Sequence, residues 1–214
     1  MAPELKFCGL TRAADAAAAV AAGEDHPEVA RAGGPRAVTP AAAAAVLGAV
    51  PPGVDTVGVF GRLEPSRMAE QAAEAGVSTL QLHGDPTPAE LEAARAAWGG
   101  AVWAVLRCER GQLPEGAEGL FRSADAVVLD AKVPGALGGT GVPLPWQALR
   151  DDVERLRSHC RVVLAGGLRP DNVSQAVREL APDVVDVSSG VEEAPGIKDH
   201  ARLRAFAAAA RSVG

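Results

Sequence analysis

Two residues of this chain have the chemistry of an acid–base pair, and each stands at the end of a predicted strand. Cys8 ends the short strand that begins at Leu5, and Asp130 directly follows the apolar run Ala126–Leu129. A thiolate is a competent general base, and a protonated carboxyl group is a competent general acid. A cysteine beside a helix start can have a lowered pKa, although a free cysteine is more often a small buried apolar residue. We therefore treat Cys8 and Asp130 as candidate catalytic residues.

Two loops of small residues in the C-terminal third of the chain could bind a phosphate group. Gly166-Gly167 follows the apolar strand predicted at Val162–Ala165, and Ser188-Ser189-Gly190 follows the one at Val184–Val187. Small residues let backbone N–H groups approach phosphate oxygens, and the N-terminus of a following helix adds a favourable dipole. One such loop is readily explained as a tight turn between strand and helix, but two in succession favour a phosphate cradle.

Two further polar residues occupy loops where a ligand could bind. His83 follows the strand predicted at Thr79–Leu82, where it is either a donor to a ligand or a structural hydrogen-bond partner. Arg36 lies in a Pro-Arg pair after a glycine loop. No cluster of His, Asp or Glu has the spacing of metal ligands, and no GxSxG motif is present. We therefore predict no metal site.

The spacing of apolar runs predicts alternating strands and helices at intervals of about 25 residues. Eight such units predict a single (β/α)8 barrel domain spanning residues 1–214, with the active site at the carboxyl ends of the strands and a phosphate site after strands seven and eight. An open doubly wound sheet is the alternative, but no GxGxxG follows the first strand. The seven regular strands are predicted at Leu5–Cys8, Thr56–Phe60, Thr79–Leu82, Val102–Leu106, Ala126–Leu129, Val162–Ala165 and Val184–Val187.

The segment where the second strand should lie breaks this pattern. Residues Glu24 to Arg31 read EDHPEVAR, which is polar and is interrupted by Pro27. Strands of a parallel barrel are buried on both faces, and proline cannot donate to a ladder. The segment is therefore predicted to be unable to form a buried parallel strand, and the barrel to be irregular or disordered over residues 24–36.

Composition narrows the classes of partner. The net charge of −6 and the lack of a dense Lys/Arg patch argue against nucleic acid, and no apolar run approaches the roughly 20 residues of a membrane span. The first residues lack the features of a secretory signal, and the three cysteines, Cys8, Cys108 and Cys160, are odd in number and far apart. A cytoplasmic protein with free thiols is the expectation, either monomeric or homodimeric.

Short motifs along nearly the whole chain resemble those of one enzyme family. The run KFCGLT at residues 6–11 resembles the opening motif of the phosphoribosylanthranilate isomerases, which are (β/α)8 enzymes of tryptophan biosynthesis. Further motifs resemble that family in the same order along nearly the whole chain. They are VGVF at 57–60, LQLHG at 80–84, LD at 129–130, GGTG at 138–141, LAGGL at 164–168, VDVSSGVE at 185–192 and PGIKD at 195–199.

The resemblance implies an Amadori rearrangement of N-(5-phosphoribosyl)anthranilate that needs no metal or organic cofactor. By the family pattern, Asp130 would be the general acid that protonates the furanose ring oxygen, and Cys8 the general base that removes the C2 proton. Arg36 would bind the anthranilate carboxylate by a charge-assisted contact, with His83 as a further substrate-binding residue. The residues implied at the phosphate end are Gly139, Gly141, Gly166, Gly167, Ser188, Ser189 and Gly190.

Two departures from the family leave other functions open. The polar segment Glu24–Arg31 stands where the family has an apolar strand, and Pro145 stands where an aspartate is common. Weak turnover with a raised KM would fit such a barrel. A related sugar-phosphate isomerase of histidine biosynthesis is one alternative, but those enzymes use an aspartate where Cys8 stands. A catalytically impaired protein that binds a phosphorylated ligand is the other.

Overall fold

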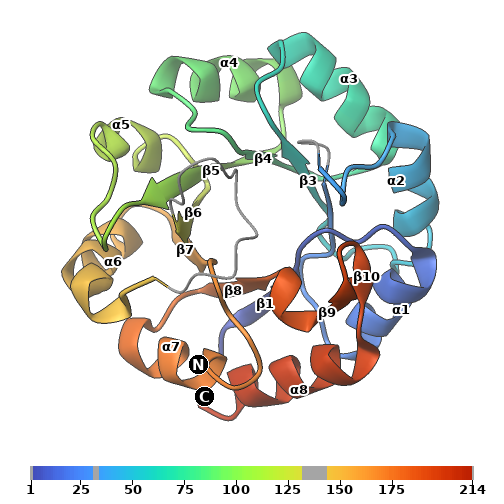
Figure 1. Cartoon of the computed structure of the whole chain (residues 1–214). Coiled ribbons are helices and arrows are strands. Elements are labelled where there is room, and N and C mark those ends of the chain that lie inside the picture. Colours follow the sequence, from blue (N-terminus) through green and yellow to red (C-terminus); the bar gives the residue numbers. More distant parts are fainter. Residues whose placement is uncertain (1, 31–33, 132–143, 214) are drawn as a thin grey trace.

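Eight parallel strands form the inner wall of the molecule, and helices surround them (Figure 1). The computed structural model describes residues 2–30, 34–131 and 144–213. The strands lie in the order β1-β8-β7-β6-β5-β4-β3-β2, which is that of a nearly closed barrel and confirms the predicted fold class. Their bounds are β1 Glu4–Phe7, β2 Glu28–Ala30, β3 Val57–Phe60, β4 Thr79–Leu82, β5 Ala101–Cys108, β6 Ala126–Ala131, β7 Arg161–Leu164 and β8 Val184–Val187.

Helices follow the strands and pack on the outside of the barrel (Figure 1). The α-helices are α1 Ala13–Ala21, α2 Pro40–Leu47, α3 Pro65–Ala75, α4 Pro88–Trp98, α5 Ala117–Phe121, α6 Arg150–Arg157, α7 Val173–Leu180 and α8 His200–Arg211. Two 3-10 turns, η1 Trp146–Leu149 and η2 Ser189–Val191, and a short antiparallel hairpin of β9 Glu192–Ala194 and β10 Ile197–Lys198 complete the elements. None of the helices in the described part of the chain is both long and apolar enough to cross a bilayer.

Local sequence explains where several helices begin and end. Proline occupies the first turn of α2, α3 and α4, where its missing N–H group is not needed. At the start of α4, Thr87 and Glu90 form a capping box, and Gly99 ends the helix with a φ of 75°. Gly76 ends α3 in the same left-handed conformation. These residues determine where the helices begin and end. They therefore also determine how many residues separate one strand from the next.

The two faces of each strand belong to two apolar layers. One layer lies between the strands and the helices and contains Leu5, Phe7, Leu129 and Val185. A smaller cluster fills the inside of the barrel, with Val128 and Val184 among its members. Successive side chains of a strand alternate between faces. It follows that the neighbours of the outward-facing residues on β1, β6 and β8 point into the barrel, and several of these neighbours are charged.

The prediction that the polar segment cannot form a buried parallel strand is wrong for Glu28–Ala30. These residues form β2, which pairs in parallel with β3 so that Val29 lies opposite Gly58. Glu28 and Val29 have no exposed surface. Pro27 precedes the strand, where its carbonyl oxygen accepts the N–H of Val57 and its lack of a donor does no harm. Residues 31–33, within the range predicted to be irregular, lie outside the described residues.

Acidic side chains explain how so polar a segment fits beside β1. The carboxyl group of Glu24 accepts the N–H of Phe7 at 2.6 Å, and that of Asp25 accepts the N–H of Leu5 at 2.9 Å. In a regular ladder these two donors would bind carbonyl groups of the neighbouring strand. The side-chain oxygens replace those carbonyls, so the segment needs acidic residues here rather than apolar ones.

Only isolated backbone hydrogen bonds accompany these contacts among the described residues of β1 and β2. The N–H groups of Asp25 and His26 donate to the carbonyl of Leu5 at 3.0 and 3.1 Å, and that of Leu10 donates to Glu28 at 2.9 Å. We call this junction, Leu5–Leu10 against Glu24–Glu28, the β1–β2 seam. The barrel is thus irregular at the predicted place, but it is held together there by side chains.

Candidate active site

The inner face of the seam carries a buried ionic cluster. Lys6 and Glu28 have no exposed surface, and Asp186 on β8 is 6% exposed. The Lys6 ammonium donates to Asp186 Oδ2 at 2.9 Å and also contacts Glu28 Oε2. Buried charges are stable only when they are paired in this way. The cluster therefore has one positive and two negative groups, with the ammonium between the carboxylates.

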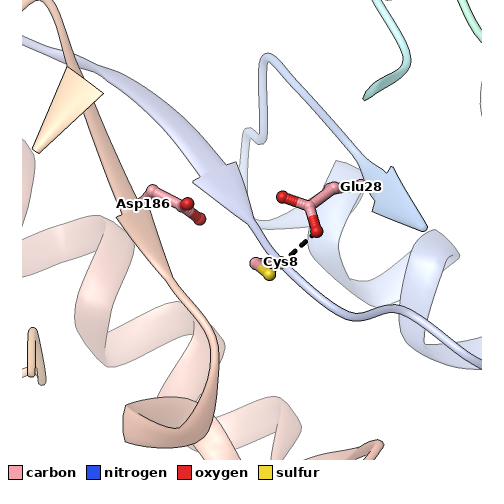
Figure 2. A group of neighbouring side chains, drawn as sticks. All are labelled: Cys8, Glu28 and Asp186. Atoms are coloured by element: carbon pink, nitrogen blue, oxygen red, sulfur yellow. Dashed lines mark hydrogen bonds between the residues drawn. The ribbon is translucent and has the colours of Figure 1, made fainter. Parts of the chain in front are cut away.

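Cys8 lies at the edge of this cluster, directly after β1. Its Sγ atom donates to Glu28 Oε1 at 2.8 Å, as Figure 2 shows, with Asp186 on the other side of the sulfur. Burial raises the pKa of the Cys8 thiol, although the nearby Lys6 ammonium lowers it. The thiol form is therefore favoured at neutral pH, and a base is needed to make the thiolate.

The side chains of Cys8, Glu28 and Asp186 also offer three donor atoms of the kinds that bind metal ions. The donor atoms of Cys8, Glu28 and Asp186 all lie within 4.8 Å of one another. The Lys6 ammonium, however, bonds to both carboxylates and already supplies the positive charge that a cation would bring. The arrangement is that of an ion-paired cluster with a thiol at its edge.

Asp130 is the last residue but one of β6. The sequence predicted that the strand ends at Leu129, but β6 continues to Ala131. Asp130 is 7% exposed, and its Oδ1 accepts the N–H of Ala131 at 2.8 Å. Burial raises the pKa of Asp130, and the charge of Asp186 raises it further, while His83 and Arg107 lower it. The carboxyl group thus keeps its proton to a higher pH than an exposed aspartate does, as a general acid requires.

Asp186 acts electrostatically on both candidate catalytic groups. Its negative charge raises the pKa of both Cys8 and Asp130, so both groups lie within its field. Cys8 and Asp130 both stand at the carboxyl ends of their strands, β1 and β6. The structure therefore places the thiol and the carboxyl group at the same end of the barrel, where active sites of this fold are found.

The two predicted phosphate loops follow β7 and β8 and lie against each other. Gly166 and Gly167 have φ values of 79° and 66°, which side chains rarely adopt. A Cβ atom at Gly190 would overlap the carbonyl oxygen of Leu168, so the loops touch through backbone. Within the described part of the chain, no backbone acceptor bonds the N–H groups of Gly166 or Gly167. These donors are suited to an anion.

The remaining members of the predicted phosphate site are divided between described and undescribed parts of the chain. Ser188 and Ser189 lie between β8 and the first turn of η2, and the carbonyl of Ser188 accepts the Lys198 ammonium at 3.3 Å. Gly139 and Gly141 lie outside the described residues. The assignment of all these residues to a phosphate stays a prediction.

Arg36 forms a bidentate ion pair within the protein. Its Nε and Nη2 atoms donate to the Glu192 carboxylate at 2.8 and 2.6 Å, and this pairing raises the pKa of Arg36. Lys198 binds the same carboxylate at 2.9 Å and donates to the carbonyl of Cys8 at 2.5 Å. The arginine stem crosses Gly9, where a Cβ atom would crowd it. Arg36 thus lies beside Cys8, and Glu192 takes two of its five donors.

His83 stands at the end of β4. Its backbone N–H donates to the carbonyl of Phe60 at 2.7 Å, which continues the β3–β4 ladder. Its side chain lowers the pKa of Asp130 by its charge. The structure therefore places His83 in the electrostatic surroundings of the candidate acid, and a contact with ligand stays a prediction.

Comparison with known proteins identifies the family. The family model for N-(5'-phosphoribosyl)anthranilate isomerase matches residues 5–209. The isomerase of Pseudomonas fluorescens is 41% identical over 96% of this chain and 97% of its own length. The crystal structure of the Thermus thermophilus isomerase is 35% identical, covers 99% of this chain and 100% of its own, and has a TM-score of 0.85.

The chain belongs to the N-(5'-phosphoribosyl)anthranilate isomerase family. It is an isomerase of tryptophan biosynthesis with a TIM-barrel fold, so the predicted family, enzyme class and fold are confirmed. Another solved phosphoribosylanthranilate isomerase, 27% identical with a TM-score of 0.83, covers 98% of this chain and 99% of its own. It was crystallised in complex with reduced 1-(o-carboxyphenylamino)-1-deoxyribulose 5-phosphate.

The buried ionic cluster of Lys6, Glu28 and Asp186 was not predicted from the sequence. In the sequence, Lys6 and Asp186 are single letters within the motifs KFCGLT and VDVSSGVE, and Glu28 lies in the polar segment that argues against a strand. The available signal was a charged residue between apolar neighbours of a short strand, as in ELKF and VVDV. Because side chains alternate along a strand, such a residue points into the barrel when its neighbours face the helices. Glu28 carried no comparable signal, because its neighbours on one side are polar.

Proposed function

We propose that this chain converts N-(5-phosphoribosyl)anthranilate into 1-(2-carboxyphenylamino)-1-deoxyribulose 5-phosphate, with Asp130 as general acid and Cys8 as general base. One observation supports the assignment above the others. A buried carboxyl group with a raised pKa and a thiol lie at the same end of one barrel, and Asp186 acts on both. Two groups of unlike acidity that face a common space suit a reaction that adds one proton and removes another.

Asp130 carries the first step. The protonated carboxyl group donates to the furanose ring oxygen, the bond between C1 and that oxygen breaks, and the anthranilate nitrogen forms an iminium with C1. Because burial raises the pKa of Asp130, the proton is retained at pH values where an exposed aspartate has lost it. The rate of this step is therefore expected to fall as the pH rises through that raised pKa.

Cys8 carries the second step. The thiolate removes the proton from C2 of the iminium, which gives an enolamine, and the enolamine tautomerises to the 2-ketone product. Burial raises the pKa of the thiol, so the thiolate, once formed, is a strong base. The whole sequence consists of proton transfers and one ring opening, and it needs no metal or organic cofactor.

The two ends of the substrate have suitable partners. The backbone donors of Gly166, Gly167 and Ser188-Ser189-Gly190 suit the phosphate, and Gly139 and Gly141 belong to the same proposed site. Arg36 suits the anthranilate carboxylate, since a guanidinium binds a carboxylate by charge-assisted hydrogen bonds. The related isomerase in complex with a reduced product supports this class of ligand, a phosphorylated sugar joined to an aromatic acid.

The test is the turnover of Cys8→Ser and Asp130→Asn, followed by the loss of anthranilate fluorescence from freshly generated substrate. Each variant is expected to lose about 10²–10⁴-fold in kcat, the range for removal of a general acid or base, while it still binds a reduced product analogue. Cys160→Ser is the matched control, because this free thiol lies before β7 at the opposite end of the strands, and its turnover should be unchanged. Wild-type rates in Cys8→Ser or Asp130→Asn would reject the assignment.

A further inference from the structure

We propose that Glu28 accepts the thiol proton of Cys8, so that the two side chains act as a pair that shares one proton. The inference rests on the proposed role of Cys8 as the base and deepens it by naming the group that activates the thiol. The thiol donates directly to Glu28 Oε1 at 2.8 Å, and Glu28 has no exposed surface (Figure 2). Glu28 does not face the substrate in this scheme and acts only through Cys8.

The charges of the cluster prevent Cys8 from ionising alone. Lys6 carries one positive charge, and Glu28 and Asp186 carry two negative charges. A thiolate would add a third negative charge within hydrogen-bond distance of a buried carboxylate. Two anions this close in a buried site titrate as a pair, and one of them keeps a proton. The thiolate of Cys8 therefore forms when its proton moves to Glu28.

The other acidic groups near the Cys8 sulfur form hydrogen bonds with other partners. Asp186 Oδ2 is bonded to Lys6, and the Glu24 carboxyl accepts the N–H of Phe7. Burial raises the pKa of Glu24 well above its ordinary value, which disfavours its charged form. Among the described acidic groups, Glu28 is the one that accepts a hydrogen bond from the sulfur.

The cations and hydroxyl that face Cys8 stabilise its thiolate without taking its proton. Lys198 donates to the carbonyls of Cys8 and Ser188, and its charge lowers the pKa of the thiol, as does a hydrogen bond from Ser188. Arg36 is held by Glu192. The two cations have no acceptor for the proton, and a serine hydroxyl is far too weak a base to take it.

Over one turnover, the enzyme releases as many protons as it takes up. At the start the pair holds one proton, which moves from sulfur to Glu28 Oε1 and leaves a thiolate. The thiolate then takes the C2 proton, so the pair holds two, and the excess proton leaves to water. Asp130, which has given one proton to the ring oxygen, regains one from water. The substrate is isomerised with no net gain or loss of protons.

The rate of Cys8 alkylation as a function of pH tests the pair directly. Iodoacetamide reacts with the thiolate, and mass spectrometry of peptides separates Cys8 from Cys108 and Cys160. A thiolate formed by internal proton transfer is present at a fraction that does not depend on pH while the pair holds one proton. The wild-type rate constant is therefore expected to change less than about twofold between about pH 6 and 8.

Glu28→Gln removes the acceptor, and the thiol must then lose its proton to water. Its alkylation rate is expected to fall about tenfold for each unit of pH below the thiol pKa, with no plateau. Its kcat should fall by about 10²-fold or more with KM little changed, since the substrate does not touch Glu28. If the Glu28→Gln variant keeps the pH-independent alkylation rate and the kcat of wild type, the proposal is overturned.

Glu24→Gln is the matched control, since it changes a second buried glutamate of the same segment that does not contact sulfur. It should keep the plateau. If Glu28→Gln fails to fold, the wild-type profile decides alone: a plateau supports the pair, and a tenfold fall per unit down to about pH 6 overturns it. Wild-type turnover in Cys8→Ser would instead reject the proposed function, and the alkylation profile would still report the pair.

Discussion

The β5–β6 ladder and the β1–β2 seam hold neighbouring strands together by different means. In the first, residues Trp103–Cys108 pair without interruption with residues Ala126–Ala131, and the side chains are almost all apolar and buried. In the second, the strands meet through isolated backbone bonds and through the carboxyl groups of Glu24 and Asp25. Continuous backbone pairing stabilises the ladder. At the seam, ionisable side chains replace part of that pairing.

This difference separates the two candidate catalytic groups. Asp130 ends a regular ladder, so its position depends on strand pairing and its acidity on burial. Cys8 ends the strand at the seam, so its hydrogen bond depends on Glu28, while its pKa is raised first by burial and then changed by Lys6 and Asp186. Burial within a regular ladder suits an acid that must keep its proton. A polar surrounding suits a base that must lose its proton in each turnover.

The largest loss of stability is expected from Lys6→Met, which removes the ammonium group from the β1–β2 seam. Glu28 and Asp186 would then be buried without their shared partner, and the loss of one member of a buried ion pair costs about 3–5 kcal/mol. Removal of the cation disfavours the charged forms of both buried carboxyl groups. That makes the loss smallest at acid pH, where they are protonated, and larger as the pH rises.

Urea unfolding of Lys6→Met and wild type at about pH 5 and 8 would measure this. The difference in free energy of unfolding between the two proteins should be greater at the higher pH. An equal loss at both values would show that the seam is stabilised by packing rather than by charge.

Leu129→Ala is the corresponding change in the ladder. Leu129 on β6 has no exposed surface and belongs to the layer between strands and helices. Truncation of a buried leucine costs about 2–5 kcal/mol through lost apolar contact and a residual cavity. No charge is involved, so the loss measured by urea unfolding should be the same at both pH values. A loss that grows with pH would mean that the ladder, too, depends on titrating groups.

The regular part of the barrel was readable from sequence because its signals are local. The apolar runs predicted β4 and β8 with the observed bounds, and the proline and glycine at the two ends of α3 are local signals of the same kind. The catalytic candidates were found from their position after apolar runs and from the family motifs. These signals do not need knowledge of which strands are neighbours.

The seam could not be read in the same way, because its stability depends on contacts between distant residues. Polarity and Pro27 argued against a strand at Glu24–Arg31, yet acidic residues there bind the N–H groups of β1, some 20 residues earlier in the chain. Likewise, Glu28 gains a role only because Lys6 and Cys8 lie opposite it. The rule that parallel strands are apolar fails where the neighbouring strand brings its own charge.

Glu24→Gln should have a smaller effect, and one of opposite sign. Burial raises the pKa of Glu24 well above its ordinary value, so the folded state keeps a proton that the unfolded state loses. Stability from this group is complete below the unfolded pKa and is lost as the pH rises through the folded one. Glutamine is neutral and still accepts the N–H of Phe7. The variant should therefore be more stable than wild type at about pH 8, by about 1.4 kcal/mol for each unit of the shift, and equal to it near pH 4.

Thermal unfolding at both pH values measures that difference. A variant less stable than wild type at pH 8 would show that Glu24 is ionised in the folded protein, and would place another negative charge in the seam.

The smallest effect is expected at Asp25, whose carboxylate accepts the N–H of Leu5. Asp25→Ala leaves this buried donor without its acceptor, and the loss should be about 1–3 kcal/mol, towards the low end because Asp25 is half-exposed and water can reach the site. Asp25→Asn keeps an acceptor oxygen and should be within about 0.5 kcal/mol of wild type. Hydrogen exchange of the Leu5 amide is the sharper readout, because it reports the opening of this one bond.

Faster exchange of that amide is expected in the alanine variant and near-wild-type exchange in the asparagine variant. The amide of Val105 on β5 is the internal reference, since it lies within the ladder and should not change in either protein. If alanine leaves the Leu5 amide as protected as before, another group closes the seam at this point, and the carboxylate of Asp25 is a surface charge rather than a substitute for a strand carbonyl.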